Sequence, residues 1–416
     1  QEQVVSEGVA NNITVRRVKK FNLENYIMSN LLPQNNVKKV DTFSAAFNGV
    51  NMGNCVLFVD TIPFAFDIDV KGFKQREVSS PNNEIIIQGP QEAFVENIRT
   101  NTSLLRRIVN SENLIIENVE IGKLSKTKCT ICYMSNIASS NLIAEVRYRM
   151  NNLEIDSLLS SGELEQLIEE NYTCSIPQVL MTERPDKATK YLYGGRVVVL
   201  VNGNPYALIL PATLTDFISS PEDTNLRFQF ANFLKILRLL AIGITLLLPG
   251  LYVAITDFHQ ELLPTELLFS ILSSRENVPF PIIFEILVME ISFELIREAG
   301  LRVPSPIGPT IGIVGALVLG QAAVSASIVS PILIIIVAIT AIASFAIPDF
   351  AFGFHLRLMR FAFILFGYIA GFFGVGIGLF VYVCVLCSLK SFGVPYTAPY
   401  APVTGIGENG FIVNPM

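Results

Sequence analysis

The residues most able to do chemistry lie in an apolar stretch, residues 278–298, that has the length of a membrane span. Glu290, Glu294 and Glu298 recur at every fourth residue, so on a helix they share one face, and Arg297 falls on that face too. Carboxylates are costly next to lipid and therefore face other helices or water. The pattern leaves two interpretations: an internal seam of salt bridges between helices, or a carboxylate stripe lining an aqueous path for cations.

Uncharged polar residues in a neighbouring apolar stretch extend this candidate site. Gln321 and Ser325 lie in a run that carries no charge. Such side chains either line a pore or form hydrogen bonds with neighbouring helices. The candidates for an ion path or its gate are therefore Glu290, Glu294, Gln321 and Ser325.

The other reactive residue types form no catalytic or metal-binding pattern. One C-x-x-C pair, Cys129 and Cys132, lies in a strand-like run, and a second, Cys384 and Cys387, lies in a membrane segment, so we interpret both as buried reduced thiols. The sequence has no Walker loop, nucleophile elbow or zinc motif. Its net charge of -6 does not favour nucleic acid. We predict a protein that is not an enzyme and that uses no metal, cofactor or nucleic acid.

The elements that must position the candidate residues are membrane helices. Three stretches lack charge entirely: residues 239–256, 303–348 and 361–389. A span needs about 20 apolar residues, so the long middle stretch is two spans. The sequence thus predicts an all-α polytopic transmembrane bundle over 232–390, with helices at about 235–256, 308–326, 330–347 and 361–388 and a possible fifth at 278–298.

Basic residues near the span ends predict the orientation. Arg227, Lys235 and Arg238 precede the first span, which places the amino-terminal region in the cytoplasm. With five spans, Arg297, Arg302, Arg357 and Arg360 all fall inside as well, and the tail, residues 391–416, falls outside. If 278–298 does not span, the side of the tail is reversed.

Small residues predict close helix packing. Gly308, Gly312, Ala316 and Gly320 form a stripe with a spacing of four residues. Stripes of this kind let helix backbones approach closely in lipid. The stripe packs either against helices of the same subunit or against identical subunits in a homo-oligomer.

The first 231 residues alternate strand-like and helix-like runs and predict a cytoplasmic α/β region of two small subdomains, 1–137 and 138–231. Strands are expected at 55–60, 64–70, 84–87, 114–121 and 129–134 in the first and at 178–182, 196–201 and 206–210 in the second. Helices are expected at 91–109, 139–151 and 160–169. Asn202-Gly203 is a strong hairpin signal.

Several motifs resemble the spore germination receptor A-subunit (GerA) family, including its SpoVAF-like branch. In the α/β region they are Glu84-Ile-Ile-Ile-Gln-Gly-Pro, Thr182-Glu-Arg-Pro-Asp-Lys and Ser219-Ser-Pro-Glu-Asp. In the membrane part they are Val278-Pro-Phe-Pro, Met289-Glu-Ile-Ser-Phe-Glu, Pro304-Ser-Pro-Ile-Gly and Ser391-Phe-Gly-Val-Pro-Tyr. The likeness runs in order from about residue 20 to residue 400.

This resemblance implies a multi-pass protein of the spore inner membrane that takes part in germination. It implies a homo-oligomeric ring that releases ions, a permease-like B-subunit and a lipoprotein C-subunit as partners, and the lipid bilayer as surroundings. In the SpoVAF-like branch it implies a response to ion release without a nutrient-binding partner. Two other functions compatible with the residues are a secondary transporter and a membrane scaffold that conducts nothing, although the spans show no internal repeat.

Overall fold

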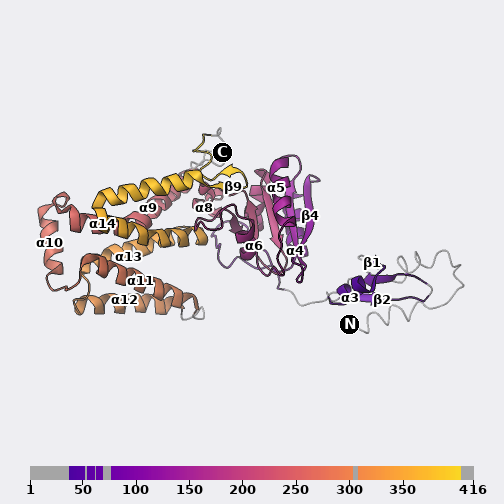
Figure 1. Ribbon diagram of the computed structural model, residues 1–416, viewed down its shortest axis with the longest axis horizontal. Helices are drawn as coiled ribbons and strands as arrows, with labels where there is room; N and C mark the ends of the chain where they lie inside the picture. Colours follow the sequence, from indigo (N-terminus) through magenta and orange to yellow (C-terminus); the bar gives the residue numbers. More distant parts are fainter. Residues whose placement is uncertain (1–36, 52–53, 61, 69–75, 303–307, 404–416) are drawn as a thin grey trace. The chain divides into compact units, whose positions relative to one another are not determined.

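The computed structural model describes residues 37–51, 54–60, 62–68, 76–302 and 308–403. The chain divides into two compact units, residues 1–75 and 76–416. In its described residues, the amino-terminal unit has a three-stranded antiparallel sheet with the order β1-β3-β2 and one helix (Figure 1). Its elements are β1 (Val37–Val40), α3 (Phe43–Asn51), β2 (Cys55–Leu57) and β3 (Ala65–Ile68).

The second unit begins with an antiparallel five-stranded sheet in the order β4-β5-β7-β8-β6. The strands are β4 (Leu114–Ile121), β5 (Thr127–Met134), β6 (Leu180–Thr182), β7 (Val197–Val201) and β8 (Ala207–Leu210). Strand β5 pairs directly with β7, with Ile131 opposite Val199. This sheet takes strands from both sides of residue 137, so the expected division into two subdomains at that residue is wrong. The boundary between the two compact units instead lies, in the sequence, between residues 75 and 76.

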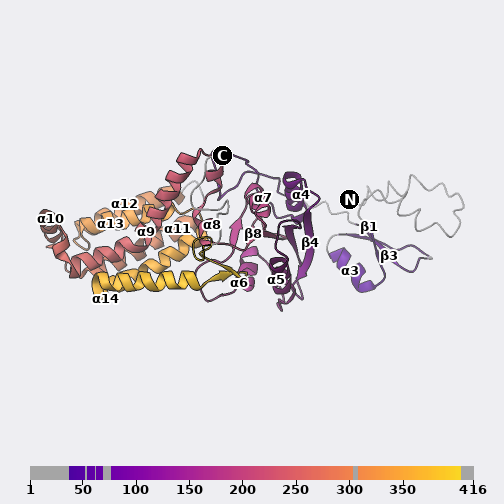
Figure 2. The same cartoon turned by 90° about the horizontal axis from the view of Figure 1, so that it is seen from above.

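Helices cover both faces of this sheet (Figure 2). Helices α4 (Ile98–Val109) and α7 (Pro185–Tyr193) bury apolar side chains in a core on one face. Helices α5 (Ser140–Asn151) and α6 (Ser161–Ile168) do so on the other. The short helix α8 (Leu214–Ile218) and a 3-10 turn, η2 (Pro221–Thr224), lead to the membrane helices.

Two local predictions in this region are wrong. The helix expected over 91–109 begins only at Ile98, because the Asn97 side chain accepts hydrogen bonds from the first free N–H groups and caps the helix. Residues 84–87 are not a strand. Their backbone is held by side chains instead: Glu183 Oε1 accepts from the N–H of Glu84 at 2.8 Å, and Arg184 donates to the Glu84 carbonyl at 3.2 Å.

The described residues between 228 and 388 are mostly helical. The helices are α9 (Phe228–Phe258), α10 (Thr265–Arg275), α11 (Ile282–Arg302), α12 (Gly308–Ser325), α13 (Pro331–Phe345) and α14 (Phe350–Ser388), with a 3-10 turn, η3 (Gln260–Leu262), after α9. Among the described residues, α9 and α14 are long and apolar enough to cross a membrane, and α13 is a shorter apolar helix. An α/β region followed by membrane-type helices is therefore confirmed, and the stretch 278–298 is helical from Ile282 onward, within α11.

Helix α14 is a hairpin of two antiparallel helices rather than one rod. The break lies at Ala370 and Gly371, where Gly371 has φ 58° and ψ -140°, a conformation that favours glycine. The Tyr382 hydroxyl lies 3.1 Å from His355 Nε2, whereas in a straight helix these residues would be about 40 Å apart. The single span expected at 361–388 is therefore wrong, because the chain reverses in the middle of that apolar run.

The hairpin places the tail next to the α/β region. Helices α9 and α14 both start beside the α/β region. In α9, Arg238 Nη1 lies 2.6 Å from Asp223 Oδ2, and in α14 the Phe352 ring stacks on Phe217. After α14, the strands β9 (Lys390–Ser391) and β10 (Val394–Pro395) return to the sheet, where Ser391 Oγ donates to the Gln178 carbonyl at 2.6 Å. The five-span interpretation, which placed the tail on the side opposite the α/β region, is wrong because the two halves of α14 are antiparallel and return the tail to that region.

Helices α9 and α14 touch through glycine. A Cβ on Gly367 would lie 2.3 Å from the carbonyl oxygen of Gly250, and a Cβ on Gly250 would lie 2.5 Å from the carbonyl oxygen of Phe363. Only glycine permits this backbone contact, which fixes α9 against the first half of α14.

Candidate functional site in the membrane helices

A charge cluster lies between α11 and the first half of α14. Arg360 Nη2 lies 2.8 Å from Glu290 Oε2 and 3.0 Å from Glu294 Oε1. Arg357 donates to the other oxygen of Glu294 at 3.1 Å. The Glu290 and Arg360 side chains are 0% and 1% exposed, so this pair is withdrawn from both lipid and water.

A third arginine ties α13 to the cluster. Arg297 donates to Ser344 Oγ at 2.7 Å, lies 4.6 Å above the Phe345 ring and approaches Glu294 to 3.8 Å. Three guanidinium groups thus face two carboxylates, and the cluster joins three helices. Arg357 and Arg360 lie about 10 to 15 Å along α14 from its start, so the cluster is in the half of the helices nearer the α/β region.

Glu290 is the least satisfied member of the cluster. Its Oε2 is close to Arg360, but the pair is not aligned as a hydrogen bond, and within the described residues neither oxygen of Glu290 has a hydrogen-bond partner. Arg360 Nε lacks one as well. Burying a carboxylate that is held by a single misaligned ion pair is energetically costly.

The structure separates the predicted site residues. Glu290 and Glu294 come together in a salt-bridged seam, as the first interpretation expected. Glu298 does not join them, since it is exposed and pairs with Arg302 at 2.6 Å. Gln321 and Ser325 are exposed on α12, away from the cluster. Sequence reasoning used Arg357 and Arg360 only for orientation, although their spacing of three residues, on one face of a helix, was the available signal.

The predicted glycine stripe is described only at its end. A Cβ on Gly320 would lie 3.7 Å from the Ile334 side chain of α13, so this position packs inside the chain. The surroundings of Gly308, Gly312 and Ala316 lie outside the described residues. Whether the stripe also packs between copies stays a prediction.

A second buried carboxylate, Glu285, joins helices at the end of the bundle away from the α/β region. Glu285 Oε1 accepts from Arg275 at 2.9 Å, and its Oε2 accepts from the N–H of Ser330 at 3.0 Å. Ser330 in turn caps α13. Glu285 therefore ties α10 and the start of α13 to α11.

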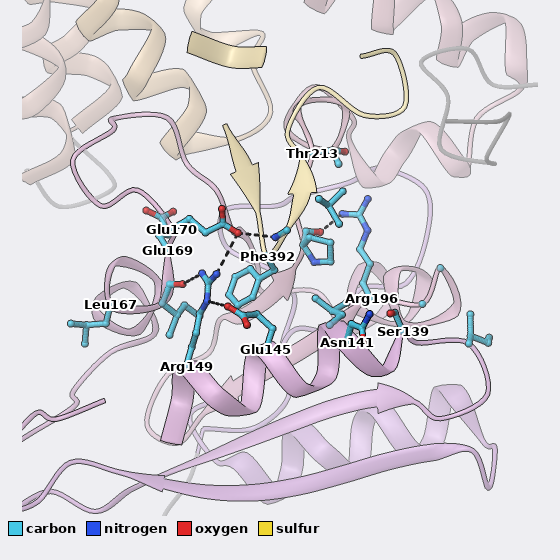
Figure 3. Close-up of a pocket in the computed structure, with 18 residues that line it drawn as sticks. Ser139, Asn141, Glu145, Arg149, Leu167, Glu169, Glu170, Arg196, Thr213 and Phe392 are labelled. Carbon is cyan, nitrogen blue, oxygen red and sulfur yellow. Dashed lines mark hydrogen bonds and ion pairs between the residues drawn. The ribbon is translucent and has the colours of Figure 1, made fainter. Parts of the chain in front are cut away.

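A groove lies where the tail returns to the α/β region (Figure 3). It has a volume of about 1270 Å³ and charged walls. Arg149 donates to Glu145 Oε1 and to the Ile168 carbonyl, both at 2.7 Å, and its guanidinium lies 4.4 Å from the Phe392 ring. Glu170 accepts from the N–H of Gly393 at 2.7 Å. These charges hold the tail hairpin against α5 and α6.

Polar contacts also link the α/β region to both halves of α14. Ser175 Oγ lies 2.8 Å from His355 Nδ1, and the His355 ring stacks on Tyr382. A displacement of either half of α14 would therefore disturb a loop of the α/β region.

The cysteines form no reactive centre in the described part of the chain. Burial raises the pKa of Cys129 and of Cys132 to about 12, so both are protonated at neutral pH. The expectation that the second pair is buried is wrong, since Cys384 and Cys387 are exposed on the second half of α14. The described residues contain no group of three or more His, Cys, Asp or Glu that could hold a metal ion.

Comparison with known proteins identifies close relatives along the whole chain. Residues 1–415 match the family described as Bacillus/Clostridium GerA spore germination protein. Spore germination protein KA of Bacillus subtilis (strain 168) is 42% identical over 381 residues, which cover 92% of this chain and 70% of that protein. Spore germination protein B1 of the same organism is 43% identical over 350 residues, covering 83% and 72%.

Two further similarities complete the comparison. The uncharacterized membrane protein YfkQ of Bacillus subtilis (strain 168) is 38% identical over 375 residues, covering 90% of this chain and 73% of that protein. The crystal structure of the N-terminal domain of the A subunit of the Bacillus megaterium spore germinant receptor GerK3 is 41% identical, covering 29% of this chain and 97% of that chain, with a TM-score of 0.25.

Proposed function

The chain belongs to the GerA family of spore germination proteins, and from this premise we propose that it is the A subunit of a spore germinant receptor. The match along the whole chain and relatives above 40% identity that are themselves spore germination proteins support this role. We place it in the inner membrane of the spore, with the α/β region in the cytoplasm, together with a permease-like B-subunit and a lipoprotein C-subunit.

The position of the arginines supports this orientation. Arg357 and Arg360 lie in the half of α14 nearer the α/β region, and Arg302 ends α11 on the same side. Basic residues gather on the cytoplasmic side of membrane proteins. The α/β region and the tail hairpin then share the cytoplasm.

The mechanism we propose is that the charge cluster is a lock that keeps the membrane helices closed. The buried Glu290–Arg360 pair carries this proposal. Leaving one member of a buried pair inside the protein without its partner costs about 3 to 5 kcal/mol. Shifting a two-state equilibrium from 1:99 to 99:1 needs about 5.5 kcal/mol, so loss or gain of this pairing could supply a large part of the free energy that a switch requires.

When the lock opens, α11 and α14 separate and an ion path forms. We propose that copies of the chain surround this path and release ions through it. The exposed Gln321 and Ser325 on α12 would then line its wall, since polar side chains facing outward from a single chain need a neighbour or water inside a membrane. A signal bound by a partner subunit drives opening only through contacts that differ between the two states.

The test is ion release from spores that carry Glu290→Gln or Glu294→Gln. Both changes keep size and remove charge, so we expect altered release kinetics at an unchanged amount of protein in the spore membrane. Glu298→Gln is the matched control, because Glu298 is an exposed carboxylate on the same helix. Normal release in both test variants would remove the cluster from the mechanism.

A further inference from the structure

The tail hairpin, residues 389–396, supplies one aromatic side chain to each of the two cores of the α/β region. Phe392 is 6% exposed and packs in the core that α5 and α6 cover. Tyr396 is 0% exposed and packs in the core that α4 and α7 cover. The hairpin is therefore part of the α/β region in its packing, although it follows the last membrane helix in the chain (Figure 1).

Hydrogen bonds fix the hairpin beside two paired strands of the sheet. The buried Ser391 hydroxyl accepts from the N–H of Ala212 at 3.0 Å and donates to the Gln178 carbonyl at 2.6 Å. The Tyr396 carbonyl accepts from the N–H of Leu214 at 2.8 Å. Gln178 lies just before β6 and Ala212 just after β8, and these two strands pair with each other. The hairpin is thus held to the sheet by its backbone as well as by its aromatic side chains.

Both halves of α14 share a core with the α/β region. The Phe217 ring lies 5.8 Å from that of Phe352, in the first half of α14, and 5.9 Å from that of Tyr396, measured between ring centroids. Tyr382, in the second half, belongs to the same core and stacks on His355 in the first half. The α/β region, the tail hairpin and α14 are therefore packed as one body.

Helices α11 and α13 pack in a different core. Ile286 of α11 and Leu333 of α13 are both buried in it, and its buried residues all lie between Tyr252 and Ile364. Helix α12 joins this group, because a Cβ on Gly315 would lie 3.9 Å from the α11 side chain of Ile296. The charge cluster lies where this second group of helices meets α14.

From these contacts we propose that the tail hairpin is a strap that makes both halves of α14 move with the α/β region, so that the charge cluster opens by a movement of α11, α12 and α13 relative to that body. The inference rests on the proposed function, since it takes the Glu290–Arg360 pair as the lock. Close-packed cores resist deformation, so each core moves as a unit and the change falls at the boundary between them. The α/β region then acts on the lock through α14.

The test measures two distances in the full chain by pulsed electron paramagnetic resonance in mixed micelles. The native cysteines are replaced by serine or alanine, and labelled chain is diluted with unlabelled chain so that distances between copies do not contribute. Leu124→Cys in the β4–β5 turn is the reference on the α/β region. It is paired with Phe380→Cys on the second half of α14 or with Val318→Cys on α12, and all three positions are exposed.

The first comparison weakens the lock with Glu290→Gln. The distance between residues 124 and 318 should shift by about 2 to 5 Å, the range of helix movements in switching proteins, and the distance between 124 and 380 should stay the same. A shift between 124 and 380 overturns the inference and leaves the lock in place. If neither distance shifts, the proposed lock fails and the inference with it.

The second comparison weakens the strap itself. Phe392→Ala removes the side chain that packs against α5 and α6, so the distribution of distances between 124 and 380 should broaden. Val403→Ala is the matched control, because Val403 lies in the same tail and is 88% exposed. Ser391→Ala, which removes both hydrogen bonds of that hydroxyl, repeats the measurement should Phe392→Ala fold poorly. If the strap variants leave the distribution as narrow as the control does, the inference is overturned.

Discussion

Replacing Arg360 by methionine should be the most damaging single change in the charge cluster. Arg360 Nη2 is the group within ion-pair distance of Glu290, at 2.8 Å. Without it Glu290 remains buried with no cation beside it, whereas Glu294 keeps Arg357 at 3.1 Å. The change therefore leaves one uncompensated carboxylate between apolar helices.

The expected cost follows from this loss. Removing one partner of a buried ion pair destabilises a protein by about 3 to 5 kcal/mol. At about 1.4 kcal/mol per factor of ten, the folded-to-unfolded ratio falls by about two to four orders of magnitude. Glu290→Met should cost less, because Arg360 still has Glu294 at 3.0 Å. The double variant should be more stable than Arg360→Met alone, because it has no unpaired carboxylate.

The assay is a double-mutant cycle on the reversible unfolding of the purified chain in mixed micelles. We expect a coupling energy of about 2 kcal/mol or more between Glu290 and Arg360. The matched control is the exposed pair Glu298 and Arg302, 56% and 79% exposed, for which about 0 to 1 kcal/mol is expected. If the buried pair couples no more strongly than the exposed one, it is not a lock.

Three further predictions concern packing, pH and reactivity. Gly367→Ala should destabilise the purified chain by about 1 to 3 kcal/mol, because the added Cβ would lie 2.3 Å from a backbone carbonyl oxygen of α9. Gly376→Ala is the control and should not destabilise the chain, because a Cβ there has no atom within 4 Å. A denaturant titration compares the two variants, and equal effects would contradict the glycine contact. Burial and neighbouring carboxylates raise the pKa of Glu165 from 4.5 to about 8, so the folded state holds a proton that the unfolded state releases. Stability should then fall as pH rises from about 4.5 to about 8, and Glu165→Gln should show a smaller loss of Tm between pH 6 and pH 8; identical pH profiles would refute this. Cys129 and Cys132 should resist alkylation at pH 8 in the folded chain and react after denaturation, which mass spectrometry detects.

The elements that could be predicted from the sequence are those whose signals lie within a few neighbouring residues. The alternating strands β4, β5, β7 and β8 were expected, and Asn202-Gly203 forms the predicted turn between β7 and β8, with Gly203 at φ 88°. The pairing of β5 with β7 could not be foreseen, because they are separated by about 60 residues and no local pattern encodes a partner. The single sheet across residue 137 depends on that pairing.

The membrane part shows the same limit. A charge-free run at 361–388 has the length of one span, and the glycine that reverses the chain, Gly371, is one of several in that run. In the site, the spacing of Glu290 and Glu294 was sufficient to select them. Their arginine partners on α14 lie more than 60 residues further along the chain, on a face that only the packing of α14 against α11 brings into contact.

The reversal at Gly371 also limits how much of the polypeptide is exposed at the end of the helices opposite the α/β region. The described connections there are residues 259–281, 326–330 and the turn at 370–371. Together they hold one lysine or arginine, Arg275, and its guanidinium is occupied by Glu285. With the proposed membrane placement, trypsin confined to that side of a sealed vesicle would find a single cleavage site in these described connections, after Arg275.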